Sequence, residues 1–157
     1  MTKIGTCLWF DNQAAEAVTF YTSIFQGSEI SAVTYENDAP QVPGGQVTVI
    51  AFELLGQRFT AFNGGPTFKF SEAVSIVVEV DTQAEIDRYW EALLEGGGTE
   101  SMCGWLKDKY GLSWQIVPRS LPQLMGGPDK ARSFRVSAAL MKMVKLDIAA
   151  LEAAAAG

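Results

Sequence analysis

Apolar residues follow two different spacings along the chain, and the change between them predicts the order of strands and helices. Runs rich in apolar and β-branched residues, bounded by glycine or proline, indicate strands, and apolar positions three to four residues apart indicate helices. The first half is expected to hold strands at 3–10, 29–36, 46–55 and 57–63, a helix at 12–26 and a loop at 37–45. The second half is expected to hold strands at 73–80, 99–103, 104–110 and 112–117 and a helix at 82–95. Each half therefore has the predicted order of strand, helix and three strands.

A repeated segment marks the same point in the two halves. Asp-Asn-Gln-Ala at 11–14 recurs as Asp-Thr-Gln-Ala at 81–84, each time between a predicted strand and a predicted helix. Asp11 and Asp81 are interpreted as helix caps, because a carboxylate at a helix start accepts hydrogen bonds from unpaired amides. The glutamine two positions later is expected to support the same helix start. Two copies of one module suggest two half-units with a cleft, which is where a functional site would lie.

The pattern becomes helical after Pro118. A helical turn is predicted at 119–125, and one long helix is predicted from Pro128 to about 155. This long helix needs a partner surface for its apolar positions, which are Phe134, Val136, Leu140, Met143, Val144, Ile148 and Leu151. That partner is either the sheet of the same chain or a second subunit.

The composition excludes several classes of function. The net charge of −6 argues against a basic surface for nucleic acid. The segment Met1–Ile4 has no signal-peptide core, and no apolar run approaches the length of a membrane span. The two cysteines, Cys7 and Cys103, are interpreted as reduced thiols in a cytoplasmic protein. The absence of histidine excludes serine–histidine and cysteine–histidine catalysis.

Four motifs narrow the fold. These are the segments Trp9–Ala14, Phe20–Tyr21, Asn63–Pro66 and Cys103–Pro118, of which the last is the longest and most specific. They resemble the PhnB-like branch of the vicinal oxygen chelate superfamily, which includes glyoxalase I, bleomycin-resistance proteins and extradiol dioxygenases. Families of this kind often carry the label 3-demethylubiquinone-9 3-methyltransferase.

The resemblance implies an α+β fold of two βαβββ modules. Their strands would form a cupped eight-stranded mixed sheet, with helices on the convex face, a site on the concave face and a second copy completing a homodimer. It also implies one glyoxalase-like domain at 1–118, with half-modules at about 3–63 and 73–118, and a C-terminal helical extension at 119–157. The methyltransferase label has no support in the motifs, because the glycines at 96–98 end a helix and do not open one after a strand.

The metal site of the superfamily takes one ligand from the first strand and one from the last strand of each half, usually histidine, glutamate or glutamine. The aligned positions here are Ile4, Thr60, Val74 and Gln115, with Thr6 and Ser75 as alternatives at the first strands. One glutamine oxygen does not hold a divalent ion, since a catalytic site needs about three protein ligands. We therefore expect no metal and no other cofactor, unless Glu53, Glu79 or a second subunit completes the site.

Alternation along the strands selects the candidate contacts. If Gln115 faces the cup, the period of two places Ser113 on the same face and favours Thr60 and Phe62 in the other half. The same rule aligns Cys103 with Trp105 and Lys107. The candidate ligand-binding residues are therefore Thr60, Phe62, Cys103, Trp105, Lys107, Ser113 and Gln115. Such a lining would be mostly apolar with a few hydrogen-bonding groups.

Two of these residues have an alternative interpretation. Cys103 is either a nucleophile activated by a neighbouring lysine or a small buried apolar residue beside a tryptophan. Lys107 is either a contact for an anionic ligand or a charge that protects an edge strand.

Three functions fit the sequence. The first is a metal-independent protein that binds a small molecule in the cup. The second is a lyase or isomerase that transfers a proton through Glu53 or Glu79. The third is a dimeric interaction module with a filled cup.

Overall fold

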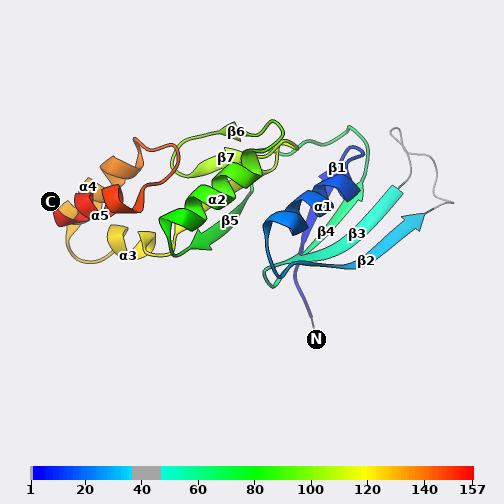
Figure 1. Cartoon of the computed structure of the whole chain (residues 1–157), viewed down its shortest axis with the longest axis horizontal. Coiled ribbons are helices and arrows are strands. Elements are labelled where there is room, and N and C mark those ends of the chain that lie inside the picture. Colours follow the sequence, from blue (N-terminus) through cyan, green and yellow to red (C-terminus); the bar gives the residue numbers. More distant parts are fainter. Residues whose placement is uncertain (1, 37–46) are drawn as a thin grey trace. The chain divides into compact units, whose positions relative to one another are not determined.

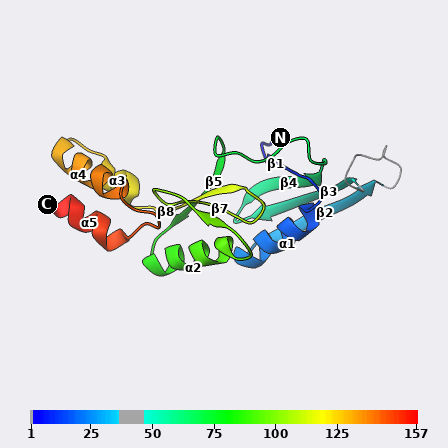
Figure 2. The same cartoon turned by 90° about the horizontal axis from the view of Figure 1, so that it is seen from above.

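The computed structural model describes residues 2–36 and 47–157, so the loop predicted at 37–45 lies outside the described residues. Contacts divide the chain into two compact units, Met1–Phe70 and Ser71–Gly157. Each unit contains a four-stranded mixed sheet with a helix on one face (Figures 1 and 2). The predicted α+β class with two βαβββ modules is confirmed. The single domain and the joined eight-stranded sheet stay predictions.

The N-terminal unit is a complete βαβββ module. Its elements are β1 (Thr6–Phe10), α1 (Ala14–Ile24), β2 (Glu29–Glu36), β3 (Val47–Leu54) and β4 (Gln57–Asn63). The strand order is β1-β4-β3-β2, with β1 parallel to β4 and the other pairs antiparallel. Leu55 and Gly56 connect β3 to β4 with φ angles of 49° and 87°. Positive φ at both turn residues is the geometry of a two-residue hairpin, which confirms the predicted tight turn.

Alternation in these strands separates a core face from an open face. Helix α1 covers the core face, where apolar side chains are buried, among them Leu8, Phe10, Ile50, Phe52, Phe59 and Ala61. Because neighbouring side chains on a strand point to opposite faces, the residues between them lie on the face without a helix. This second surface is called the open face of the sheet below.

The C-terminal unit repeats the module. Its elements are β5 (Ser75–Val80), α2 (Gln83–Leu94), β6 (Thr99–Glu100), β7 (Trp105–Lys107) and β8 (Ser113–Pro118), in the sheet order β5-β8-β7-β6. Helix α2 covers the face that buries Val78, Trp114 and Ile116. The strand predicted at 99–103 ends at Glu100, so the prediction is wrong for residues 101–103. Cys103 and Gly104 have φ angles of 60° and 81°, so the chain turns there and cannot continue as a strand.

The two helix starts differ from the predicted aspartate caps. In α2 the cap is Thr82, whose hydroxyl accepts the Glu85 amide while the Glu85 carboxylate accepts the Thr82 amide. The Asp81 carboxylate instead accepts a hydrogen bond from Arg119 at 3.2 Å. In α1 the first helical amide, that of Ala14, donates to Asn63 Oδ1 at 2.8 Å. Side chains from another position in the sequence therefore replace the expected local cap in α1.

The C-terminal extension contains three helices where one turn and one long helix were predicted. They are α3 (Leu121–Met125), α4 (Lys130–Leu140) and α5 (Ile148–Ala156). The predicted long helix breaks at 141–147. There Met143 and Val144 accept backbone hydrogen bonds from Cys103 and Gly104 at 2.8 Å, and Leu146 is fully buried.

This segment joins the extension to helix α2 of the same chain. Gln83 donates to the Leu146 carbonyl at 3.0 Å and accepts the Ile148 amide at 2.9 Å. Lys145 forms an ion pair with Asp87 at 2.6 Å. Part of the extension therefore finds its partner within the C-terminal unit. Within the described residues no helix is both long and apolar enough to span a membrane.

Candidate functional site

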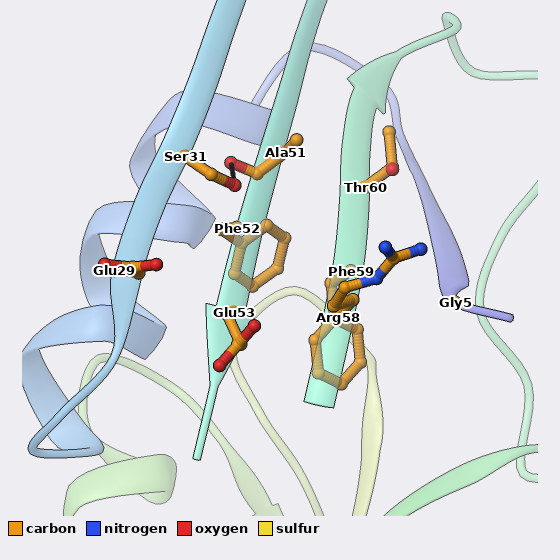
Figure 3. Close-up of a pocket in the computed structure, with 9 residues that line it drawn as sticks. All are labelled: Gly5, Glu29, Ser31, Ala51, Phe52, Glu53, Arg58, Phe59 and Thr60. Atoms are coloured by element: carbon orange, nitrogen blue, oxygen red, sulfur yellow. Dashed lines mark hydrogen bonds between the residues drawn. The ribbon is translucent and has the colours of Figure 1, made fainter. Parts of the chain in front are cut away.

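The open face of the N-terminal sheet carries a cavity of about 400 Å³. It is lined by Gly5, Glu29, Ser31, Ala51, Phe52, Glu53, Arg58, Phe59 and Thr60. Figure 3 shows Glu29 on β2, Glu53 on β3, and Arg58 and Thr60 on β4. The volume falls within the range of roughly 300–1,000 Å³ that is common for small-molecule sites. We call this cavity the N-terminal pocket.

Strand register explains how these residues meet. Glu53 lies opposite Arg58 across the β3–β4 hairpin and opposite Glu29 across β2–β3. Residues opposite each other in an antiparallel pair share a face, with Cβ atoms about 4.5–5.5 Å apart. One guanidinium and two carboxylates therefore project from the same patch of the open face. Among the described residues, no salt bridge or side-chain hydrogen bond engages any of these three groups.

The lining of the N-terminal pocket is more charged than the apolar lining expected from the sequence. Thr60, a predicted contact, is half-buried in it. Phe62, the other predicted contact in this half, shares the open face but packs edge-on against Trp9, with ring centroids 4.8 Å apart. The indole N–H of Trp9 donates to the Gly65 carbonyl at 2.8 Å. Phe62 therefore belongs to an aromatic cluster beside the pocket.

The face of the C-terminal sheet opposite α2 is called its open face. It holds Gln115, which donates to Ser75 Oγ at 2.8 Å. Trp105 lies opposite Gln115, and Lys107 lies opposite Ser113 in the β7–β8 pair. The structure thus brings four of the predicted contacts together on one face. Their role as ligand contacts stays a prediction.

Three of these residues border a second, smaller cavity of about 160 Å³. Its lining consists of Glu72, Thr99, Glu100, Ser101, Trp105, Leu106, Lys107 and Ser113. Lys107 forms an ion pair with Glu72, and this hydrogen-bonded contact lowers the pKa of the Glu72 carboxyl. We call this space the C-terminal cavity.

Cys103 does not share this face. It stands in the turn before β7, where its amide donates to Met143 and its sulfur lies 3.7 Å from Met141 Sδ. The expected alignment of Cys103 with Trp105 and Lys107 is therefore wrong, because an alternation rule applies only within a strand. Both cysteines are free thiols, as predicted.

Asp108 positions the strands that carry the C-terminal candidates. It is only 3% exposed and accepts hydrogen bonds from the amides of Tyr110 and Leu112 and from the indole N–H of Trp114. The turn between β7 and β8 is thereby closed around one carboxylate. This role was missed in the sequence, although an aspartate near Gly111 is a usual signal for such a turn.

The residues at the family's metal positions do not fit a divalent ion. Ile4 and Val74, two of the aligned positions, precede β1 and β5 and so lie outside the strands. The residues that lie opposite the other two positions, Thr60 and Gln115, are Cys7 and Val77. Cys7 is exposed, and desolvation raises the pKa of its thiol, which disfavours the thiolate that a metal needs. Within the described residues no three histidine, cysteine, aspartate or glutamate side chains are grouped to hold a metal.

Sequence reasoning also missed Glu29 and Arg58. Arg58 could have been predicted, because a two-residue hairpin at Leu55–Gly56 places position 58 opposite Glu53. Glu29 could not have been predicted, because its place on the open face depends on a register shift between Ile30 and Ala32.

Comparison with known proteins agrees with this architecture. A family model described as 3-demethylubiquinone-9 3-methyltransferase matches residues 2–117. A putative 3-demethylubiquinone-9 3-methyltransferase, PhnB protein, from Bacillus cereus is 34% identical, with a TM-score of 0.66 over 74% of this chain and 99% of that chain. No curated protein matches the chain.

Two more distant structures share the fold. Protein PA1353 from Pseudomonas aeruginosa is 22% identical, with a TM-score of 0.63 over 75% of this chain and 98% of that chain. The fosfomycin resistance protein FosX from Listeria monocytogenes, in a complex with Mn(II) and sulfate, is 14% identical, with a TM-score of 0.55 over 73% and 89%. The family match ends at residue 117, so the helical extension lies beyond it. The chain therefore belongs to the 3-demethylubiquinone-9 3-methyltransferase family, as does the PhnB protein from Bacillus cereus by its description.

Proposed function

We propose that this protein binds a small polar molecule in the N-terminal pocket and does so without a metal. The observation that carries the proposal is the meeting of Glu29, Glu53 and Arg58 around a cavity of about 400 Å³. Their charges have no partner among the described residues. Such charges on a sheet face are available to orient a ligand with a donor group near the carboxylates and an acceptor group near the guanidinium.

The donor set argues against a metal in the manner of FosX, whose structure contains Mn(II). The positions opposite Thr60 and Gln115 carry a thiol and a valine. A ligand held by charge and hydrogen bonds needs no such ion, so chelators are expected to leave binding unchanged.

Within the described residues, no structural feature matches the methyl transfer named in the family's description. The usual methyltransferase cofactor site needs a glycine-rich strand-to-helix turn in a parallel sheet. Each sheet here has one parallel pair, and Gly96 and Gly97 follow the end of α2.

A thermal-shift screen of small polar metabolites on the purified full chain tests this proposal. For a compound that raises the melting temperature, Glu53→Gln and Arg58→Gln are expected to weaken binding by about tenfold each, since each removes a charge-assisted bond. Glu79→Gln serves as the matched control, because Glu79 is exposed and lies on the other sheet. Loss of binding after metal removal, or tight stoichiometric metal, would contradict the proposal.

A second candidate function is proton transfer by Glu53. The observation in its favour is that Glu53 is half-buried in the pocket opposite Arg58, which could stabilise an anion formed when a carbon loses its proton. Glu79, the alternative base, is exposed outside this pocket. Incubation of an identified ligand in D₂O should place deuterium on that carbon with the wild type and not with Glu53→Gln. A ligand that takes up no deuterium removes the enzyme hypothesis.

We also propose a homodimer, as the family resemblance implies, and a cytoplasmic location, which two free thiols support. Light scattering after size-exclusion chromatography measures the first, and a monomer at micromolar concentration would contradict it. The interaction-module hypothesis requires that dimer and a pocket that binds no small molecule.

A further inference from the structure

The C-terminal cavity contains a buried hydroxyl that has no hydrogen-bond partner among the described residues. Ser113 is 1% exposed, and its Oγ makes no hydrogen bond within the part of the chain that the structure describes. Most buried polar groups are paired, so an unpaired one calls for an explanation such as a bound group. Ser113 borders the cavity of about 160 Å³, into which a hydrogen-bonding atom could fit.

Lys107 brings positive charge to the same place. It lies directly opposite Ser113 in the β7–β8 pair, so both side chains belong to the open face. Its ammonium is paired with the carboxylate of Glu72, which is 64% exposed. An exposed pair of this kind is weak, so an incoming anion could replace Glu72 at low cost.

Trp105 adds a further donor. The indole N–H groups of Trp9, Trp90 and Trp114 donate to Gly65, Glu100 and Asp108, respectively. Among the four tryptophans, only Trp105 has an indole N–H without a hydrogen bond within the described residues. Of the two carboxylates that line the cavity, Glu72 is engaged by Lys107 and Glu100 by Trp90. The groups left for a ligand are therefore mainly donors, which suit an acceptor-rich group.

We propose that the C-terminal cavity binds the anionic group of a small molecule, a carboxylate or a phosphate, through Lys107 and Ser113. Lys107 neutralises its charge, Ser113 donates a hydrogen bond, and Glu72 competes with it for the ammonium. The cavity is smaller than the roughly 300 Å³ of a site for a whole ligand, so it holds a head group. The inference goes beyond the proposed function, since it concerns the C-terminal unit alone.

A titration of the full chain, labelled with ¹⁵N, with sodium phosphate and separately with sodium acetate tests the inference at constant ionic strength. The four indole N–H signals report on separate places. Trp105 is expected to shift in a saturable way, while Trp9, bonded in the other unit, stays fixed. Saturation at a lower concentration of one anion identifies whether phosphate or carboxylate is preferred. Absence of a saturable Trp105 shift with both anions would overturn the inference.

Variants then separate the site from general electrostatics. Lys107→Met and Ser113→Ala are each expected to weaken anion binding about tenfold, and Glu72→Gln to strengthen it about two- to fivefold as the competing pair is lost. Lys109→Met changes the net charge equally but removes an exposed side chain outside the cavity. Equal weakening by Lys107→Met and Lys109→Met would refute a built site.

A second readout keeps the Ser113 test independent of folding. Because its hydroxyl is buried and no described residue bonds it, Ser113→Ala should leave the anion-free melting temperature unchanged or raise it. A clear drop would mean that the hydroxyl already has a structural partner, and this outcome too counts against the inference. The N-terminal pocket is tested by variants of Glu53 and Arg58, so failure at either site is distinguishable from failure at the other.

Discussion

Replacement of Asp108 by asparagine should destabilise the C-terminal unit strongly, although the two side chains have almost the same shape. One carboxylate oxygen accepts the amides of Tyr110 and Leu112 at 2.9 and 3.1 Å, and the other accepts the Trp114 indole N–H at 2.8 Å. All of these are donors. An asparagine that keeps its oxygen toward the amides must turn its own NH₂ group toward the indole N–H.

The cost follows from two contributions. One hydrogen bond to a charged acceptor is lost, worth about 1.5–3 kcal/mol, and a buried indole N–H remains unsatisfied, at about 1–3 kcal/mol. These overlap, so the expected loss in the free energy of unfolding is about 2–4 kcal/mol. If the free energy of unfolding falls by roughly 2 kcal/mol per molar urea, the midpoint of urea unfolding should fall by about 1–2 M.

Urea unfolding followed by tryptophan fluorescence measures this change. Glu91→Gln is the matched control, because Glu91 is an exposed carboxylate on α2 and its replacement should stay within about 0.5 kcal/mol. A loss below about 1 kcal/mol for Asp108→Asn, with an unchanged urea dependence, would refute the argument that this carboxylate closes the β7–β8 turn.

Three further predictions follow from the same unit. Gly104→Ala should cost more than Gly111→Ala in thermal melts. Both glycines have positive φ (81° and 85°), so the backbone strain of an alanine is similar at the two positions. A Cβ at Gly104 would lie 2.9 Å from the Ile116 carbonyl oxygen, whereas a Cβ at Gly111 meets no described atom within 4 Å. Equal losses of melting temperature in the two variants would contradict this reasoning. Leu146→Ala should lose about 2–5 kcal/mol in urea unfolding, because the side chain is fully buried, and a smaller loss would mean that 141–147 is not anchored. Hydrogen bonds from Thr82 and nearby amides lower the pKa of Glu85 from 4.5, so its ionised form stabilises the fold above that value. The gap in melting temperature between wild type and Glu85→Gln should be full at pH 7 and vanish as pH falls through the folded-state pKa, and a gap that persists in acid would show that charge is not its cause.

The sequence by itself determined the two βαβββ modules and part of the site. Local spacing of apolar residues and the glycine at position 56 place β3, the turn and β4, and the turn then fixes Glu53 opposite Arg58. Alternation within β8 correctly separated Ser113 and Gln115 from the buried Trp114 and Ile116. These features were predictable because they depend on neighbours only a few residues apart.

Tertiary structure decided the helix caps and the shape of the extension. Local propensity favours one long helix after Pro128, yet the chain breaks at 141–147, where Leu146 is buried beneath Gly104 and two carbonyls accept the amides of Cys103 and Gly104. The amide of Ala14 is likewise satisfied by Asn63, far away in the sequence. Burial of a leucine and pairing of distant backbone groups outweigh a helical preference of a few tenths of a kcal/mol per residue.

The two cavities show the same division. The sequence supplied Thr60, Trp105, Lys107 and Ser113 as candidates, because alternation assigns them to faces. Only the assembled sheets added Glu29, through the register shift in β2, and Glu72, through its ion pair with Lys107. Which charges are paired and which hydroxyl is left without a partner depends on distances between strands, and no local pattern in the sequence encodes those distances.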